Sequence, residues 1–240
     1  MTIYPPRLLS FDVFRTLLDI EEDKDSPAAF ALLARFLAYH GIVIEGELLH
    51  QRMTTLTARQ IALSSSPTPD VDVLKILESA LDGDIDSDLL GEAALVLRAA
   101  TSALSSVPGA HTAVTHLAAA WPLAVCSNTQ RAYTIAELRA FNFLPYFGTI
   151  VFSSDVGACK PDPTIFHRLF AEAGVSSADV IHIGDDYRND IVTAKNLGCK
   201  TIWVDRYNQS AQSGFDQSAA DAIVGPDLTD LPRIIAECRT

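Results

Sequence analysis

Residues 8–18, LLSFDVFRTLL, decide the fold because their short, mostly apolar run ends at an acidic residue, Asp12. Such a run, bounded by polar residues, is typical of a strand buried in a parallel sheet. Three later runs are also followed by polar groups: Ser127-Asn128, residues 160–163 (KPDP) and residues 184–190 (GDDYRND). The carboxyl ends of parallel strands meet at one edge of an open sheet. We therefore expect these four parts of the chain to form one site.

The pattern of the remaining chain agrees with a parallel sheet. From Ser106 onward, short apolar runs alternate with helical patterns, as in repeated βα units. The expected strands lie near Leu8–Asp12, Leu123–Ser127, Thr149–Phe152, Val180–Gly184 and Thr201–Val204. The expected helices lie at about His111–Ala120, Arg131–Phe141, Thr164–Ala173 and Asn189–Leu197. The fold class predicted from this alternation is α/β.

Residues 20–103 are too long to be a single crossover between the first two strands. Apolar residues recur there at helical spacing, for example Phe30, Leu33 and Leu37. Polar breaks at 64–69 and 82–84 separate the helices. We expect an all-helical cap domain over the carboxyl edge of the sheet, with residues 1–19 and 104–240 forming the core.

Composition narrows the classes of partner. The formal net charge is -12 over 240 residues, which argues against nucleic-acid or anionic-membrane partners, because these are bound by clustered Lys and Arg. The cysteines show no metal-ligand spacing; they are Cys126, Cys159, Cys199 and Cys238. The sequence shows neither a secretory signal nor the roughly 18 apolar residues that span a bilayer. We expect a cytoplasmic monomer or homodimer with reduced thiols and a small-molecule substrate.

The polar groups suggest covalent catalysis. A carboxylate nucleophile such as Asp12 needs a dry, positively biased site, and Lys160 can supply the positive charge. Ser127 and Asn128 could hold an anionic oxygen, although Ser127 could equally cap a helix and Asp12 could cap a turn. His182 alternates into a strand and is expected to be a hydrogen-bonded core residue.

The acidic cluster suggests a metal ion. Gly184, which directly precedes two aspartates, allows the backbone to approach a cation closely. Asp12 and Asp185 would face each other at the ends of adjacent strands, where two unpaired carboxylates repel. Mg²⁺, which takes few protein carboxylates and keeps several waters, would relieve that repulsion.

All four motifs, in this order, resemble those of the haloacid dehalogenase superfamily. The resemblance implies a Rossmann-like three-layer α/β/α sandwich with a helical cap inserted after the first strand, as in subfamily I, and it implies a hydrolase. The resemblance implies that Asp12 is the nucleophile, that Thr16 and Ser127 orient the transferred group, and that Lys160 balances charge. It also implies that Mg²⁺ is bound by Asp12, Asp185, Asp190 and the main-chain carbonyl of Phe14.

One departure from the superfamily pattern affects the expected reaction. Its phosphatases usually carry an Asp as general acid and base two residues after the nucleophile, and here that residue is Phe14. Losing a general acid typically costs 10²–10⁴-fold in rate. An aromatic residue at this position resembles the pattern of the 2-haloacid dehalogenases, whose halide leaves without a proton. Those enzymes, however, generally lack an acidic cluster like the one that follows Gly184 here.

Three hypotheses remain. The first is Mg²⁺-dependent hydrolysis of a small phosphorylated metabolite. The second is hydrolysis of a carbon–halogen or similar bond, with a cap arginine (Arg52, Arg59 or Arg35) binding a substrate carboxylate. The third is a weakly active or inactive binding or regulatory protein, in which Arg15 forms an ion pair with Asp12; alternatively, Arg15 binds a phosphate. Phe14, Arg15, Asn128 and Arg52 are accordingly the candidate substrate-binding residues.

Overall fold

A computed structural model describes residues 7–23, 26–83, 85–211 and 216–237. The strands are β1 Leu8–Phe11, β2 Leu18–Glu22, β3 Ser102–Ser106, β4 Leu123–Ser127, β5 Phe147–Phe152, β6 Val180–Gly184, β7 Lys200–Val204 and β8 Ala222–Val224. The α-helices are α1 Pro27–Tyr39, α2 Gly46–Leu63, α3 Val73–Ala80, α4 Ser87–Thr101, α5 Ala110–Ala118, α6 Arg131–Ala140, α7 Ser153–Val156, α8 Thr164–Ala173, α9 Thr193–Asn196 and α10 Leu231–Glu237.

The main sheet has six strands in the order β5-β4-β1-β6-β7-β8, and every neighbouring pair is parallel. β1 lies between β4 and β6, so Phe11 is opposite Val125 on one side and Ile183 on the other. The α/β class and the five expected strands are confirmed. Since β1, β4 and β6 are neighbours, the polar residues after them converge on one edge.

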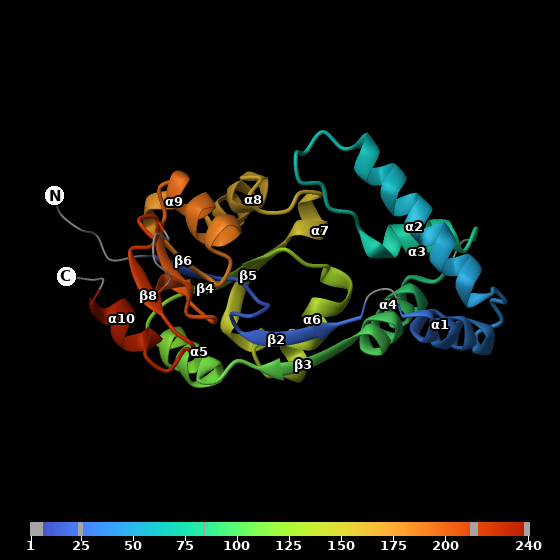
Figure 1. The fold of residues 1–240 in the computed structure, drawn as a ribbon, viewed down its shortest axis with the longest axis horizontal. Coiled ribbons are helices and arrows are strands. Elements are labelled where there is room, and N and C mark those ends of the chain that lie inside the picture. Colours follow the sequence, from blue (N-terminus) through green and yellow to red (C-terminus); the bar gives the residue numbers. More distant parts are fainter. Residues whose placement is uncertain (1–6, 24–25, 84, 212–215, 238–240) are drawn as a thin grey trace.

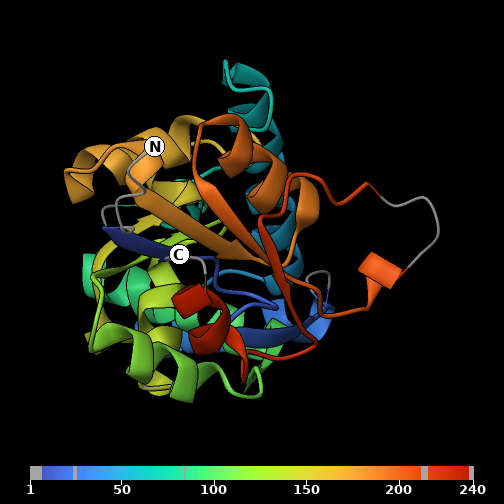
Figure 2. The same ribbon diagram turned by 90° about the vertical axis from the view of Figure 1, so that its left-hand side faces the viewer.

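Helices cover both faces of this sheet, which gives three layers (Figures 1 and 2). α5, α6 and α10 bury apolar side chains against one face, in the cluster that contains Phe11 and Leu138. α8 and α9 cover the opposite face, where Phe166 and Ala194 pack with Leu8. Alternate β1 residues therefore enter different layers, as the two-residue period of a strand requires.

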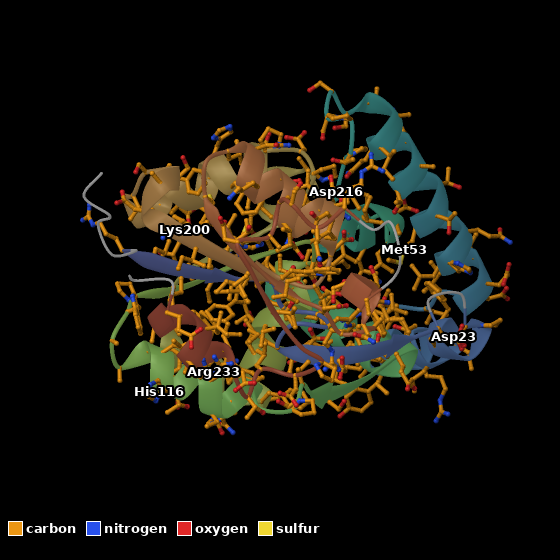
Figure 3. The ribbon with its side chains drawn as sticks, turned by 60° about the vertical axis from the view of Figure 1, so that its left-hand side comes forward. Asp23, Met53, His116, Lys200, Asp216 and Arg233 are labelled. Carbon is orange, nitrogen blue, oxygen red and sulfur yellow. The ribbon has the colours of Figure 1, made fainter. Side chains whose placement is uncertain are left out.

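The cap helices α1–α4 have a hydrophobic core of their own. Leu33, Leu49 and Ile76 are almost completely buried in it. In Figure 1 these helices lie at one end of the molecule, beyond the ribbon formed by β2 and β3. Figure 3 shows the same separation, with Met53 of α2 on the cap side and Lys200 of β7 far from it on the core.

The expectation of an all-helical insertion was wrong at both ends. β2 and β3 pair antiparallel, from Leu18 opposite Ser106 to Glu22 opposite Ser102. The β2 sequence LDIEE alternates between apolar and polar residues, which is a strand pattern. The β3 sequence SALSS is mostly polar and pairs only because it meets β2.

The remaining differences are local. The helix expected at Asn189–Leu197 is a π-helical segment, Tyr187–Val192, followed by α9. β8, α7 and α10 were not predicted, because each is short. Cys238 lies outside the described residues. Among the described helices, none combines the length and apolarity needed to cross a membrane.

Candidate active site

Asp12 follows β1 directly and lies at the floor of a pocket of about 250 Å³. Its backbone N–H donates to Ile183 O of the neighbouring strand at 2.9 Å, and the residue is 7% exposed. The predicted site residues that line the pocket with it are Phe14, Arg15, Ser127, Asn128, Lys160, Asp185 and Asp190. The expected convergence at the carboxyl edge of the sheet is observed.

Lys160 connects three strand ends. Its buried Nζ donates to Asp12 Oδ1 at 2.8 Å, to Asp190 Oδ1 at 2.5 Å and to Cys126 O at 2.9 Å. Burial alone would lower the pKa of Lys160, but the negative charges of Asp12 and Asp190 raise it. Lys160 therefore stays charged at neutral pH and supplies a fixed positive charge beside Asp12.

The loop after β4 holds the turn that carries Lys160. Asn128 Nδ2 donates to Lys160 O at 3.1 Å, and Lys160 N donates to Asn128 Oδ1 at 2.7 Å. Both polar atoms of the Asn128 amide are thus used to position the lysine. Ser127 is 1% exposed, and a hydrogen bond from its hydroxyl lowers the pKa of Asp12.

Three carboxylates gather in the pocket. One oxygen from each of Asp12, Asp185 and Asp190 lies within 4.8 Å of the others. Burial raises the pKa of Asp12 to about 6, against the attraction of Lys160. Burial and the charges of Asp12 and Asp190 raise the pKa of Asp185 to about 8. The site thus holds more negative charge than Lys160 balances, and these oxygen ligands fit a cation such as Mg²⁺.

Asp190 is the structural carboxylate of the three. Burial would raise its pKa, but the charge of Lys160 and a hydrogen bond from His182 outweigh burial and lower the pKa to about 2. Asp190 Oδ2 also accepts from Asp186 N at 3.1 Å. His182 is fully buried, with Nδ1 3.1 Å from Ser10 Oγ. The expectation of a hydrogen-bonded core histidine is confirmed.

Residues 14–16 differ in their relation to the pocket. Phe14 and Arg15 line it, and Arg15 adopts a φ of 59° in the turn after Asp12. The ion-pair partner of Asp12 among the described residues is Lys160, so the expected pairing with Arg15 is not observed. Thr16 is fully buried, and its Oγ1 has no hydrogen-bond partner among the described residues. Thr16 does not line the pocket, so the structure does not bring this predicted catalytic residue to the site.

The cap arginines proposed for substrate binding do not line the pocket. Arg52 Nη1 donates to Ala80 O at 2.8 Å and to Asp82 Oδ2 at 2.5 Å, within the cap. Arg35 and Arg59 are exposed. The arginine that the structure brings next to Phe14 is Arg98 of α4, with its guanidinium carbon 5.1 Å from the ring centroid. Arg98 shares a helix face with Leu90 and Ala94, which was a sequence signal for a buried arginine.

The polar break at 64–69 also contributes to the site, because it docks on the core. Ser66 Oγ donates to Asp162 Oδ2 and Thr68 Oγ1 to Cys159 O, both at 2.6 Å. Ser153 Oγ donates to Asp70 Oδ2 at 2.6 Å. This cap segment therefore lies against the turn that carries Lys160.

Comparison with known proteins identifies the family. The family model described as "Haloacid dehalogenase-like hydrolase" matches residues 50–204, more than half of the chain. The chain therefore belongs to the haloacid dehalogenase-like hydrolase family, as the four motifs indicated.

Curated relatives match over shorter segments. "Haloacid dehalogenase-like hydrolase domain-containing protein 3" of Danio rerio is 38% identical over 69 residues, 29% of this chain and 28% of that protein. "Phosphoglycolate phosphatase" of Pectobacterium atrosepticum is 26% identical over 113 residues, 47% of each. The matched segments thus span less than half of these relatives' length.

Solved structures match over almost the whole chain. "2-Haloacid Dehalogenase" from Pseudomonas syringae is 24% identical with a TM-score of 0.64, covering 97% of this chain and 99% of that one. "HAD phosphatase" from Thermococcus onnurineus is 19% identical with a TM-score of 0.57, covering 95% and 97%. At these identities the likeness concerns the fold, which both types of hydrolase share.

Proposed function

We propose that this protein is a Mg²⁺-dependent phosphohydrolase that acts on a small phosphorylated metabolite through a covalent intermediate on Asp12. The observation that carries the proposal is the group formed by Asp12, Asp185 and Asp190, whose oxygens lie within 4.8 Å of one another beside one buried lysine. A hydrolysis that needs no cation would gain nothing from this excess of negative charge.

In the first step, Asp12 attacks the phosphorus of the substrate. Lys160 holds Oδ1, so the other carboxylate oxygen forms the new O–P bond while the bond from phosphorus to the leaving oxygen breaks. The leaving oxygen takes its proton from water, since Phe14 offers none. In the second step, water attacks the phosphorus of the aspartyl phosphate, which releases phosphate and restores the Asp12 carboxylate.

Mg²⁺ would be held by Asp12, Asp185 and the main-chain carbonyl of Phe14, with Asp190 in support. When bound, it neutralises charge on the phosphoryl oxygens. The residues of the chain supply the rest of the electrostatics: Lys160 stays charged beside the reacting oxygens, and Ser127 offers a hydroxyl at the same strand edge.

A dehalogenase-type reaction is the second candidate, and Phe14 favours it. Phe14 lines the pocket at the position where phosphatases of the superfamily usually carry their general acid. In that reaction Asp12 attacks carbon, halide leaves, and water cleaves the resulting ester at the Asp12 carboxyl carbon. A single turnover in ¹⁸O-water separates the two: phosphoryl chemistry puts the label in phosphate, and ester hydrolysis puts it in Asp12.

The test is release of phosphate and halide over a panel of phosphate monoesters and 2-haloacids, with Mg²⁺ or with EDTA. We expect phosphate release that EDTA abolishes and that Asp12→Asn lacks. Halide release that persists in EDTA would favour the second candidate. Undiminished phosphate release by Asp12→Asn would refute the covalent route.

A further inference from the structure

The turn that carries Asp185 is held by an indole outside the pocket. Trp203 of β7 lies opposite Gly184 in the sheet, and its Nε1 donates to Asp185 O at 2.9 Å. Trp203 is 1% exposed, so water does not compete for this hydrogen bond. Trp203 does not line the pocket that contains Asp12. The indole therefore acts on the main chain of Asp185 and not on a substrate.

Asp185 relies on its main chain more than the other two carboxylates of the pocket do. Asp12 and Asp190 both accept from the ammonium group of Lys160. Within the described parts of the chain, no hydrogen bond reaches the carboxylate of Asp185. Its oxygen nevertheless lies within 4.8 Å of an oxygen of each neighbour, where like charges repel. The backbone from which the side chain extends must therefore keep Asp185 in this group.

Tyr187 fixes the orientation of the indole. Its ring centroid lies 4.9 Å from that of Trp203, and the two ring planes are inclined by 64°. This edge-to-face arrangement is one that aromatic pairs prefer. The phenol oxygen of Tyr187 accepts from Ala219 N at 3.0 Å, in the segment that precedes β8. The indole is thus packed against a side chain that is itself tethered.

The hydrogen bond also decides which oxygen of Asp185 is available to a cation. An indole N–H can only donate, so it directs Asp185 O toward β7. The carboxylate of Asp185 is the group left to act as a ligand in the pocket that this residue lines. Groups that hydrogen-bond to metal ligands typically contribute 10–100-fold to metal affinity.

We infer that Trp203 is a positioning residue for the cation site, because its indole N–H holds the main chain of Asp185 where the carboxylates of Asp185 and Asp12 can bind one Mg²⁺. Tyr187 supports it by fixing the indole. The inference rests on the proposed Mg²⁺-dependent function and assigns a residue that touches neither the substrate nor the ion.

The experiment measures the Kd of Mg²⁺ by calorimetry on protein freed of metal with EDTA, without substrate. Trp203→Phe removes the N–H together with part of the ring. Replacement of Trp203 by 3-benzothienylalanine, which has sulfur in place of the N–H, removes the donor and keeps the shape. Trp121→Phe is the matched control, because Trp121 precedes β4 and so lies toward the opposite edge of the sheet from Asp12. If Trp203→Phe does not fold, the benzothienylalanine protein carries the test.

We expect both replacements of Trp203 to raise the Kd of Mg²⁺ about tenfold or more, and Trp121→Phe to leave it unchanged. Unchanged affinity in the benzothienylalanine protein would overturn the inference, because a loss confined to Trp203→Phe would then come from the shape of the ring. In that case wild type still binds Mg²⁺ and the proposed function stands. If wild type binds no Mg²⁺, both fall.

The indole N–H signals in a ¹⁵N–¹H spectrum give a second readout, which a purely structural role of Trp203 would not move. The chain has two tryptophans, so Trp203→Phe assigns both signals. We expect Mg²⁺ to shift the signal of Trp203 and to leave that of Trp121 in place. A Trp203 signal that stays unmoved at saturating Mg²⁺ would contradict the inference.

Discussion

Lys160 shows how a single residue organises this site. Its Nζ reaches Asp12, Asp190 and Cys126 O from one buried position, and the backbone of the same residue is clamped by Asn128. A charge held in this way needs no rearrangement when negative charge develops at the phosphoryl group, which is the condition for electrostatic catalysis. The positive charge of Lys160 opposes the effect of burial, which raises the pKa of Asp12 to about 6.

Because Phe14 stands where an acid is usual, we expect a low rate of phosphate ester hydrolysis. In the proposed reaction the leaving oxygen takes its proton from water, so substrates with poor leaving groups should react slowly. We expect Phe14→Asp to raise phosphatase activity about 10²-fold on such substrates, since a positioned general acid contributes 10²–10⁴-fold. Steady-state rates on an alkyl phosphate measure this gain, with acetyl phosphate as a substrate that needs little proton donation.

Phe14→Asn is the matched control, because asparagine is similar to aspartate in size and polarity but has no acidic proton. If Phe14→Asn raised the rate equally, the effect would come from the smaller side chain and not from an acidic proton. An absence of gain in a folded Phe14→Asp protein would show that the site is committed to chemistry other than phosphate ester hydrolysis.

At the scale of elements, the turn after β6 requires glycine at 184. A Cβ placed there would lie 2.4 Å from Asp190 Oδ2, so the carboxylate that holds Lys160 would have to move. We expect Gly184→Ala to lower kcat more than tenfold and to reduce the free energy of unfolding by about 1–3 kcal/mol. Rates and urea denaturation measure the two effects.

Gly148→Ala is the control for this substitution, because no atom lies within 4 Å of a Cβ built at Gly148 in β5. Both variants replace a strand glycine by alanine. If Gly184→Ala behaved like Gly148→Ala, the close approach between Gly184 and Asp190 would be unimportant.

Asp162 joins the cap segment to the start of α8. It accepts from Thr164 N at 2.9 Å and from Ser66 Oγ at 2.6 Å. Although burial opposes it, these hydrogen bonds lower the pKa of Asp162. A carboxylate with a lowered pKa stabilises the fold above its unfolded pKa, and this contribution is lost as the pH falls through the folded value.

We therefore expect Asp162→Ala to cost about 1–2 kcal/mol of unfolding free energy at pH 7. The difference from wild type should narrow as the pH falls below about 4. Urea denaturation across this range tests both statements. Asp227→Ala removes a similar bond, to Thr229 N at 2.8 Å, without a cap contact. If the loss of unfolding free energy in Asp162→Ala did not depend on pH, this would contradict an ionic contribution from the Asp162 carboxylate.

Much of the core was predictable from the sequence, and particular residues show why. The strand Val180–Gly184 is apolar except for His182 because both faces of the sheet are covered, and polar residues follow its end. Asp12, Lys160 and Asp185 could be placed together because parallel topology brings strand ends to one edge. The roles proposed for them come from the resemblance of the motifs to the family.

The cap side of the site was less predictable. Arg52 and Arg98 both lie on amphipathic helices. The spacing of Leu90, Ala94 and Arg98 indicates a buried arginine, but only packing decides that its partner is Glu137, while Arg52 meets Asp82. Similarly, β3 forms because β2 is its neighbour and not because SALSS favours a strand. Such features depend on contacts between distant parts of the chain, which periodicity does not encode.

At the scale of the whole molecule, the cap and the core are joined by several kinds of contact. The β2–β3 ribbon is the covalent connection (Figure 1), the 64–69 segment hydrogen-bonds to the turn that carries Lys160, and Arg98 pairs with Glu137 of α6. The cap is therefore held against the core by contacts at separate places in the chain.

The central claim is that Asp12 becomes phosphorylated during turnover. The most direct measurement is to mix the enzyme with Mg²⁺ and acetyl phosphate, quench in acid during turnover and examine the peptides by mass spectrometry. We predict one phosphoryl group on the peptide that contains Asp12, absent when Mg²⁺ is replaced by EDTA and absent from Asp12→Asn. Turnover with an unmodified Asp12 peptide, or with the phosphoryl group on another residue, would contradict the account.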